Sequence, residues 1–105
     1  METNKLLSDK EMKEYLRDMD NAVLYDVFYE AGTLLSGIMV AIEREYRRRG
    51  NLDEAEKILN KDIALIKERA SVGVDDVDRQ IACKIAWTRK TQELQEFLKQ
   101  LKMEK

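Results

Sequence analysis

Residues 22–49 read AVLYDVFYEAGTLLSGIMVAIEREYRRR, and this stretch decides the fold class of the chain. Its apolar residues recur every three or four positions, which is the spacing of one face of an α-helix. Arg47, Arg48 and Arg49 suit the negative C-terminal end of a helix dipole, and Gly50 is a good helix stop. A helix of this length measures about 42 Å, which exceeds the roughly 33 Å diameter of a compact domain of this size. The stretch therefore predicts an elongated helical bundle.

Helix-capping residues place three further helices around this one. Ser8 and Glu11 have the spacing of a capping box, and Leu7 is placed to make a hydrophobic staple beside it. Asn51 and Asp75 are good N-caps because each precedes a first turn that contains acidic residues. The predicted helices cover residues 9–20, 22–49, 52–70 and 76–103. We expect an all-α, antiparallel bundle of three or four long helices.

The sequence allows either one helix or two helices over residues 9–49. Asp20 and Asn21 are suitable caps for a new helix, which favours a break there. The apolar series nevertheless continues through the break without losing phase, so a single kinked helix over residues 9–49 fits nearly as well. We expect this series to face the core. Its members are Met19, Val23, Val27, Ala31, Leu34 and Ile38.

The amino-acid composition limits the kinds of catalytic and metal sites that the protein can form. The 105 residues have 44% hydrophobic and 38% charged side chains, with four glycines and no proline, which suits one helical domain over residues 1–105. The absence of histidine excludes Ser-His-Asp and Cys-His nucleophile systems and nearly all zinc and haem sites. Cys83 is the only cysteine, so no internal disulfide forms, and we expect a small buried residue there. No cofactor or metal is predicted.

The patterning of apolar residues predicts a soluble cytoplasmic protein that has no membrane partner. The longest apolar stretch, Leu34 to Ile42, is far shorter than the roughly 20 residues that span a bilayer. The first residues, METNKLLSDKE, lack the apolar core of a signal peptide. A single thiol also suits a reducing compartment.

Carboxylates are the remaining candidates for catalysis. Glu11 and Glu14 form an E-x-x-E pair, which resembles half of the motif by which all-α nucleotide pyrophosphohydrolases bind magnesium. The second half of that motif, E-x-x-D, does not occur in this chain. A metal-dependent nucleotide phosphohydrolase is therefore an alternative, and a solvated glutamate-rich face is favoured.

Arginines provide a second alternative, an accessory protein that binds the nucleic-acid backbone. The densest basic cluster is Arg44, Arg47, Arg48 and Arg49. Glutamates one turn away pair with these arginines, and the net charge of −2 attracts no polyanion. Backbone binding would require this cluster to meet the basic residues farther along the chain, which are Lys84, Arg89 and Lys90.

Aromatic and leucine residues favour protein binding. Tyr25 and Tyr29 lie one turn apart, beside the expected core face, and partly exposed tyrosines are typical of interfaces. Trp87, Leu94, Leu98 and Leu101 approach a heptad pattern, so they predict self-association as a homodimer.

The leading hypothesis is a small non-catalytic interaction module: a regulator, adaptor or inhibitor that binds a larger protein. The tyrosines, with Arg44, Arg47 and Arg48, are its candidate partner-binding residues. In size and helical content the chain resembles small phage or mobile-element accessory proteins, bacteriocin immunity proteins and adaptor bundles.

Overall fold

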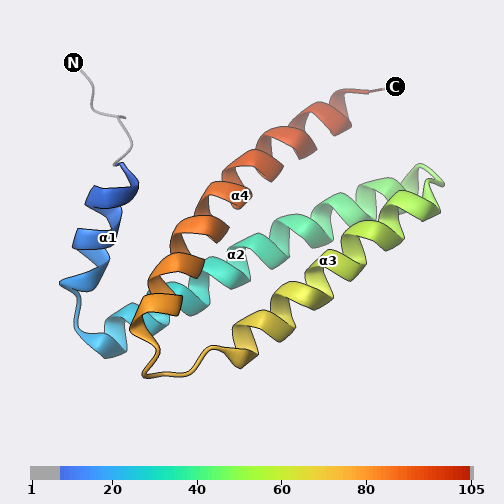
Figure 1. Ribbon diagram of the computed structural model, residues 1–105. Coiled ribbons are helices and arrows are strands. Elements are labelled where there is room, and N and C mark those ends of the chain that lie inside the picture. Colours follow the sequence, from blue (N-terminus) through green and yellow to red (C-terminus); the bar gives the residue numbers. More distant parts are fainter. Residues whose placement is uncertain (1–7, 105) are drawn as a thin grey trace, which may run out of the picture.

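The computed structural model describes residues 8–104, and these residues contain four α-helices. They are α1 (Asp9–Arg17), α2 (Asn21–Arg48), α3 (Leu52–Ser71) and α4 (Val77–Met103) (Figure 1). The molecule measures 46 × 40 × 16 Å along its principal axes, so it is a flat, elongated plate. The predicted all-α, elongated fold is confirmed. Leu7, the predicted staple residue, lies outside the described residues.

The first two helices are separate. The Asp20 side chain accepts a 2.9 Å hydrogen bond from the backbone N–H of Ala22 and so begins α2 as a new helix. α1 ends at Arg17, three residues before the predicted end. Its predicted capping box is present: the Ser8 and Glu11 backbone N–H groups donate to one another's side chains at 2.9 and 3.1 Å.

A glycine turn folds α3 back along α2. Gly50 has a φ of +78°, a left-handed conformation that glycine adopts without steric cost. The Asn51 N–H donates to the Tyr46 carbonyl at 2.9 Å, and the Gly50 N–H donates to the Arg47 carbonyl at 3.0 Å. These two bonds form a Schellman motif, which satisfies the last carbonyls of α2 and fixes the antiparallel α2–α3 hairpin.

The loop between α3 and α4 differs from the prediction in its cap. Asp76, rather than Asp75, is the N-cap of α4, because the Asp76 N–H already closes a turn onto the Gly73 carbonyl at 3.1 Å. The fully buried Gln80 side chain donates to the Gly73 and Val74 carbonyls at 2.8 and 3.0 Å. A buried amide therefore holds this loop against the start of α4.

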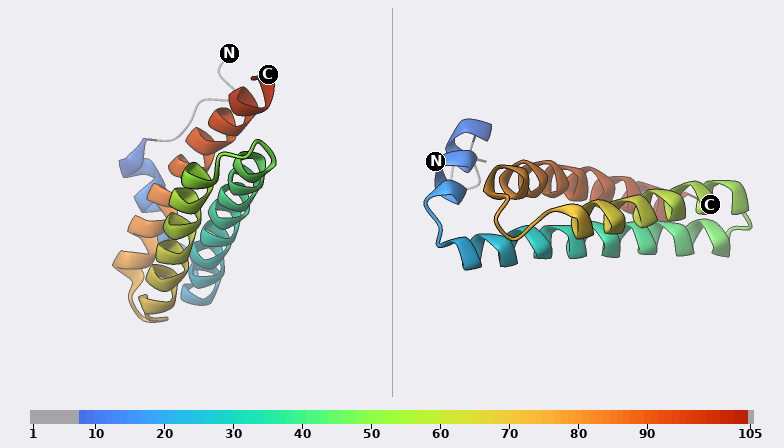
Figure 2. Two further views of the ribbon diagram at one scale, coloured as in Figure 1. Left: turned by 90° about the vertical axis from the view of Figure 1, so that its right-hand side faces the viewer. Right: turned by 60° about the horizontal axis from the view of Figure 1, so that its bottom comes forward.

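α2 is the common support of the fold. α3 and α4 both pack along it, with α3 antiparallel to α2 and α4 running in the same direction as α2 (Figures 1 and 2). α3 and α4 contact each other less, through side-chain contacts such as those of Cys83 with Glu68 and of Arg79 with Ser71, and α1 packs across the first turns of α4. α3 and α4 are therefore held together mainly through α2.

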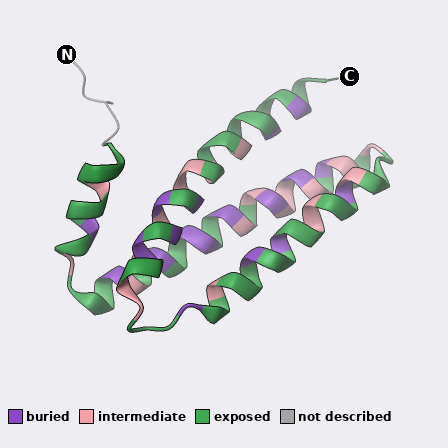
Figure 3. Cartoon of the chain, viewed as in Figure 1, coloured by how far each residue is buried: buried purple, intermediate pink, exposed green. Residues whose placement is uncertain are grey.

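The core lies along the inner side of α2 (Figure 3). Phe28 is fully buried at its centre and stacks on Trp87 of α4, with ring centroids 5.4 Å apart. Arg69 of α3 closes this region by donating to the Tyr29 carbonyl at 3.0 Å and the Thr33 hydroxyl at 2.8 Å. The buried residues of α2 are Leu24, Phe28, Ala31, Gly32, Leu35, Met39, Ile42 and Glu45.

The expected core face of α2 is wrong in part. Val23 and Leu34, which were expected to face the core, are 49% and 55% exposed, while their neighbours Leu24 and Leu35 are buried. The physical reason is that α2 is apolar around most of its circumference, so periodicity alone selects no single face. For the same reason α2 meets the length and composition of a membrane-spanning helix, although α3 and α4 cover its inner side.

The two glycines inside α2 predict opposite stability changes on substitution by alanine. A Cβ at Gly37 meets nothing within 4 Å, so Gly37→Ala should stabilise the fold by about 0.5–1 kcal/mol through helix propensity. A Cβ at Gly32 would lie 2.9 Å from Arg69 Cδ and 3.2 Å from the Trp87 ring, so Gly32→Ala should lower the free energy of unfolding. Urea denaturation checks both variants, and equal stabilisation by both would contradict the packing described.

A buried carboxylate on α3 gives a second prediction. Asp62 is 7% exposed, and its Oδ1 atom is buried without a hydrogen-bond partner. An unsatisfied buried polar atom costs about 1–3 kcal/mol, so we expect Asp62→Leu to raise the free energy of unfolding by about 1 kcal/mol or more. Glu56→Leu on the exposed side of α3 is the control and should change stability little. A destabilised Asp62→Leu variant would show that Asp62 has a partner.

Candidate interaction groove

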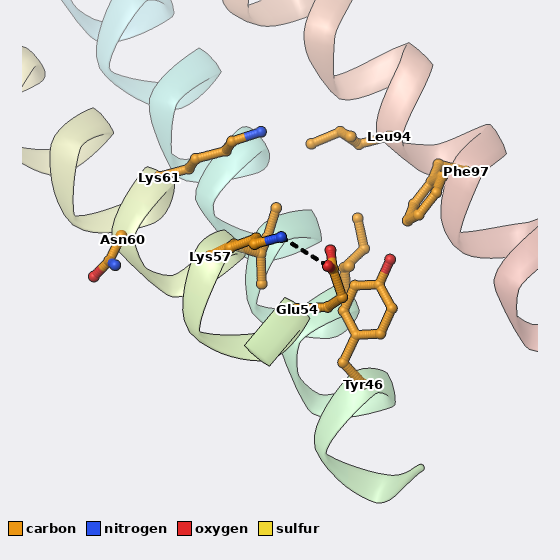
Figure 4. A pocket seen from close by; sticks show the side chains of 9 residues that line it. Tyr46, Glu54, Lys57, Asn60, Lys61, Leu94 and Phe97 are labelled. Atoms are coloured by element: carbon orange, nitrogen blue, oxygen red, sulfur yellow. Dashed lines mark hydrogen bonds and ion pairs between the residues drawn. The ribbon is translucent and has the colours of Figure 1, made fainter. Parts of the chain in front are cut away.

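An open groove lies between α3 and α4, with α2 as its floor (Figure 4). It exists because α3 and α4 both rest on α2 without closing on each other. Its volume is about 510 Å³, and it opens to solvent on the side opposite α2. The lining residues are Ile42, Tyr46, Glu54, Lys57, Ile58, Asn60, Lys61, Leu94 and Phe97.

The groove is apolar at its centre. Ile58 of α3 and Leu94 of α4 are half-buried on its two walls, and Ile42 of α2 is buried beneath them. Phe97 is 45% exposed, and its ring lies 6.4 Å from the Tyr46 ring between centroids. Large apolar side chains that remain accessible in a concave site are typical of binding surfaces.

The charged residues that line the groove lie on its α3 wall. Lys57 pairs with Glu54 at 3.0 Å, and the bond to that carboxylate raises the pKa of Lys57. Lys61 reaches from α3 toward the α4 wall, and it makes no ion pair within residues 8–104 (Figure 4). At the other end, burial raises the pKa of Tyr46, and the Glu54 and Glu104 carboxylates add to this shift. The groove thus offers one uncompensated cation beside an apolar surface.

Only one residue of the predicted self-association set lines this groove. Trp87, Leu98 and Leu101 are buried, each packed within the chain's own core. Leu94 is half-buried and lines the groove, so it is the member of the set that a second molecule reaches most readily. The heptad pattern on α4 is explained by packing on α2, and self-association through it stays a prediction.

The two tyrosines lie toward the opposite end of α2 from the groove. Tyr29 is partly exposed, and the Arg69 guanidinium lies 3.8 Å above its ring centre in a cation–π contact. Tyr25 is half-buried and packs on Phe28, with ring centroids 5.6 Å apart. Sequence reasoning missed Arg69, because its partners lie 36 and 40 residues away in the chain.

The arginine cluster at the end of α2 is largely engaged within the molecule. Arg48 and Arg49 both bind the buried Glu45 carboxylate, and their hydrogen bonds lower its pKa to about 2. Arg47 pairs with Glu43, one turn earlier. Arg44 is exposed and makes no ion pair within the described part of the chain.

Arg49 also links the C-terminal end of α2 to the C-terminal end of α4. Its guanidinium donates to the Leu101 carbonyl and, at 2.9 Å, to the Glu104 carbonyl. The Leu101 carbonyl, which also accepts the Glu104 backbone N–H, lies in the last turn of α4, and Glu104 is the C-cap residue of that helix. Arg49 therefore caps α4 from α2, a role that the sequence pattern of three consecutive arginines does not reveal.

The remaining basic and acidic candidates are separate in space. Arg89 pairs with Asp9 of α1, and Lys90 pairs with Glu93, so both lie away from the arginine cluster at the end of α2. Lys84 donates to the Thr88 hydroxyl at 3.1 Å. Glu11 serves the α1 capping box, and no group of three or more potential metal ligands occurs within residues 8–104. Glu14 is exposed on α1.

Cys83 belongs to the core. It is buried in the same cluster as Phe28 and Trp87, as expected for a small apolar residue. Burial raises the pKa of its thiol, and the nearby Glu68 carboxylate adds to that effect. A thiol with a raised pKa carries little thiolate, which is the nucleophilic form.

The Glu45 cluster predicts an acid-dependent loss of stability. Because the folded pKa of about 2 lies below the usual value of 4.5, the stabilisation is complete above about pH 4.5 and is lost as the pH falls toward 2. Glu45→Gln should flatten the fall of the unfolding free energy over this pH range. Glu56→Gln on the exposed surface of α3 is the control and should retain the steep fall. Identical pH profiles for wild type and Glu45→Gln would exclude this linkage.

Comparison with known proteins does not assign the chain to a family. No protein-family model matches it, and neither a curated protein nor a solved structure shows significant similarity to it. Among the surfaces of the molecule, the groove between α3 and α4 is a concave one with a mostly apolar lining.

Proposed function

We propose that this protein is a small non-catalytic interaction module that takes an amphipathic helix of a partner protein into the groove between α3 and α4. A regulator, adaptor or inhibitor acts in this way. The observation that carries the proposal is the separation of α3 and α4, which leaves an apolar strip of the bundle accessible.

The shape of the groove favours a helix as its occupant. α2, α3 and α4 have the arrangement of a helical bundle from which one neighbour is missing, because α3 and α4 each contact α2 and diverge from each other (Figure 1). An added helix that contacts both walls would complete the bundle. Helix-in-groove binding of this kind uses apolar anchors at positions i, i+3 or i+4, and i+7 of the partner.

The charged residues of the groove favour one type of partner helix. Lys61 is the cation of the α3 wall that lacks an intramolecular ion pair within residues 8–104, and it reaches toward Leu94 (Figure 4). A partner helix that carries an acidic residue beside its apolar anchors would pair with Lys61 while its anchors cover Leu94 and Phe97. The proposed partner is thus an acidic amphipathic helix.

Selection from a displayed library of single amphipathic helices tests the proposal. We expect the wild-type protein to enrich peptides with helically spaced apolar anchors and at least one acidic residue. Phe97→Ser should weaken binding of the selected peptides at least about tenfold, because aromatic anchors dominate such interfaces. Lys61→Glu should weaken the acidic peptides further. Fluorescence anisotropy with labelled peptides measures both effects.

Ile66→Ser is the matched control for this experiment. Ile66 and Phe97 are each 45% exposed, but Ile66 lies on α3 outside the groove. The control variant should bind the selected peptides as the wild type does. Equal losses in Phe97→Ser and Ile66→Ser, or a selection that enriches no helical pattern, would refute the groove as the binding site.

A further inference from the structure

The outer face of α2 points away from α3 and α4, and at its edge the Thr33 hydroxyl accepts a hydrogen bond from Arg69 of α3. The face begins with Val23 and continues at alternating steps of three and four residues. We propose that this outer face binds a second copy of the chain, antiparallel, about a two-fold axis near Gly37. The outer-face residues are Val23, Asp26, Glu30, Thr33, Leu34, Gly37, Val40, Arg44 and Arg48.

The centre of the outer face is uncharged and uncovered. Leu34 is 55% exposed and Val40 is half-buried, whereas the neighbouring Ala41 packs against the Ile42, Leu98 and Leu101 cluster. Exposed apolar side chains at the centre of a face with charged ends suit contact with a neighbouring molecule.

Charges at the two ends of the face identify that neighbour as another copy. Asp26 and Glu30 lie toward the N-terminal end, whereas Arg44 and Arg48 lie toward the C-terminal end. Glu30 and Arg44 are each seven residues from Gly37, and Asp26 and Arg48 are each eleven residues from it. A two-fold axis near Gly37 therefore brings the acidic end of each chain opposite the basic end of the other, as an isologous interface requires.

The ion-pair pattern within the chain leaves these charges available. Asp26, Glu30 and Arg44 make no ion pair among residues 8–104. Arg48 binds its own Glu45, yet 68% of its side chain remains exposed. Lys102 of α4 lines the same shallow hollow as Arg44 and adds to the basic end. A parallel pair of helices would place like charges together, so the charge pattern also selects the antiparallel orientation.

Gly37 suits the centre of such an interface. A Cβ at this position would meet nothing within 4 Å, so the space outside the helix is open. The missing side chain lets a second helix approach more closely at the axis than any other residue would allow. Leu34 and Val40 then flank the axis on both chains and form the apolar centre.

The area of the face sets the expected strength. A helix face about 42 Å long and about 10 Å wide contributes roughly 400 Å² per copy, or roughly 800 Å² in total. This area lies below the ~1,200–2,000 Å² of stable complexes, so the dimer should be weak and dependent on concentration. The groove between α3 and α4 lies on the opposite side of α2, so both copies keep it accessible and this inference does not depend on the proposed function.

Charge reversal and rescue tests the interface. We expect sedimentation equilibrium of the full chain, from about 10 μM to about 1 mM, to show a monomer–dimer equilibrium. Glu30→Arg or Arg44→Glu alone creates two like-charge pairs across the axis and should raise the dimer Kd about tenfold. The double variant E30R/R44E restores opposite charges and should return the Kd to near the wild-type value.

The rescue separates an interface effect from misfolding, because a destabilised single variant gains nothing specific from the second reversal. Circular dichroism should show the same helix content in all four proteins, since both residues are exposed. A wild-type protein that stays monomeric at about 1 mM would overturn the proposal. Single reversals that leave the dimer unchanged, or a double variant as weak as the single ones, would also overturn it by placing any dimer elsewhere.

Discussion

Most long-range contacts among the long helices of this protein involve α2. α3 and α4 each bury their apolar side against it, and the Phe28–Trp87 stack at its centre is the tightest aromatic contact of the core. The molecule is flat because α3 and α4 are the two long helices that pack on α2, and no further helix of the described chain covers its other sides. The groove on one side of α2 and the exposed outer face on the other both follow from this arrangement.

The ends of the helices could be predicted from the sequence because they depend on local chemistry. Ser8, Asn51 and Gly50 act through residues within five positions of themselves, so capping rules place them well. The misplaced cap, Asp75 for Asp76, has a less local cause. The Gly73 carbonyl accepts from both Asp76 and the buried Gln80, and the sequence gives no sign that Gln80 is buried.

The inner face of α2 could not be predicted, because Leu24 and Val23 are equally apolar and only tertiary packing chooses between them. The groove was likewise beyond sequence reasoning. It depends on how far α3 and α4 stand apart, which no spacing within either helix encodes. Of the candidate site residues, Leu94 alone lines it, whereas the arginines and tyrosines mostly bind groups of their own chain.

The limited contact between α3 and α4 has a consequence for cooperativity. Stability rests mainly on two interfaces, α2 with α3 and α2 with α4, and side-chain contacts between α3 and α4, such as those of Cys83 with Glu68 and of Arg79 with Ser71, add to them. The C-terminal half of α4 borders the groove, so its local detachment would break few contacts with α3 and would leave the α2–α3 hairpin in place. Arg49 opposes that movement, because it binds carbonyls at the end of α4 from the hairpin end of α2. A protein built in this way can widen its groove by partial release of one helix without global unfolding.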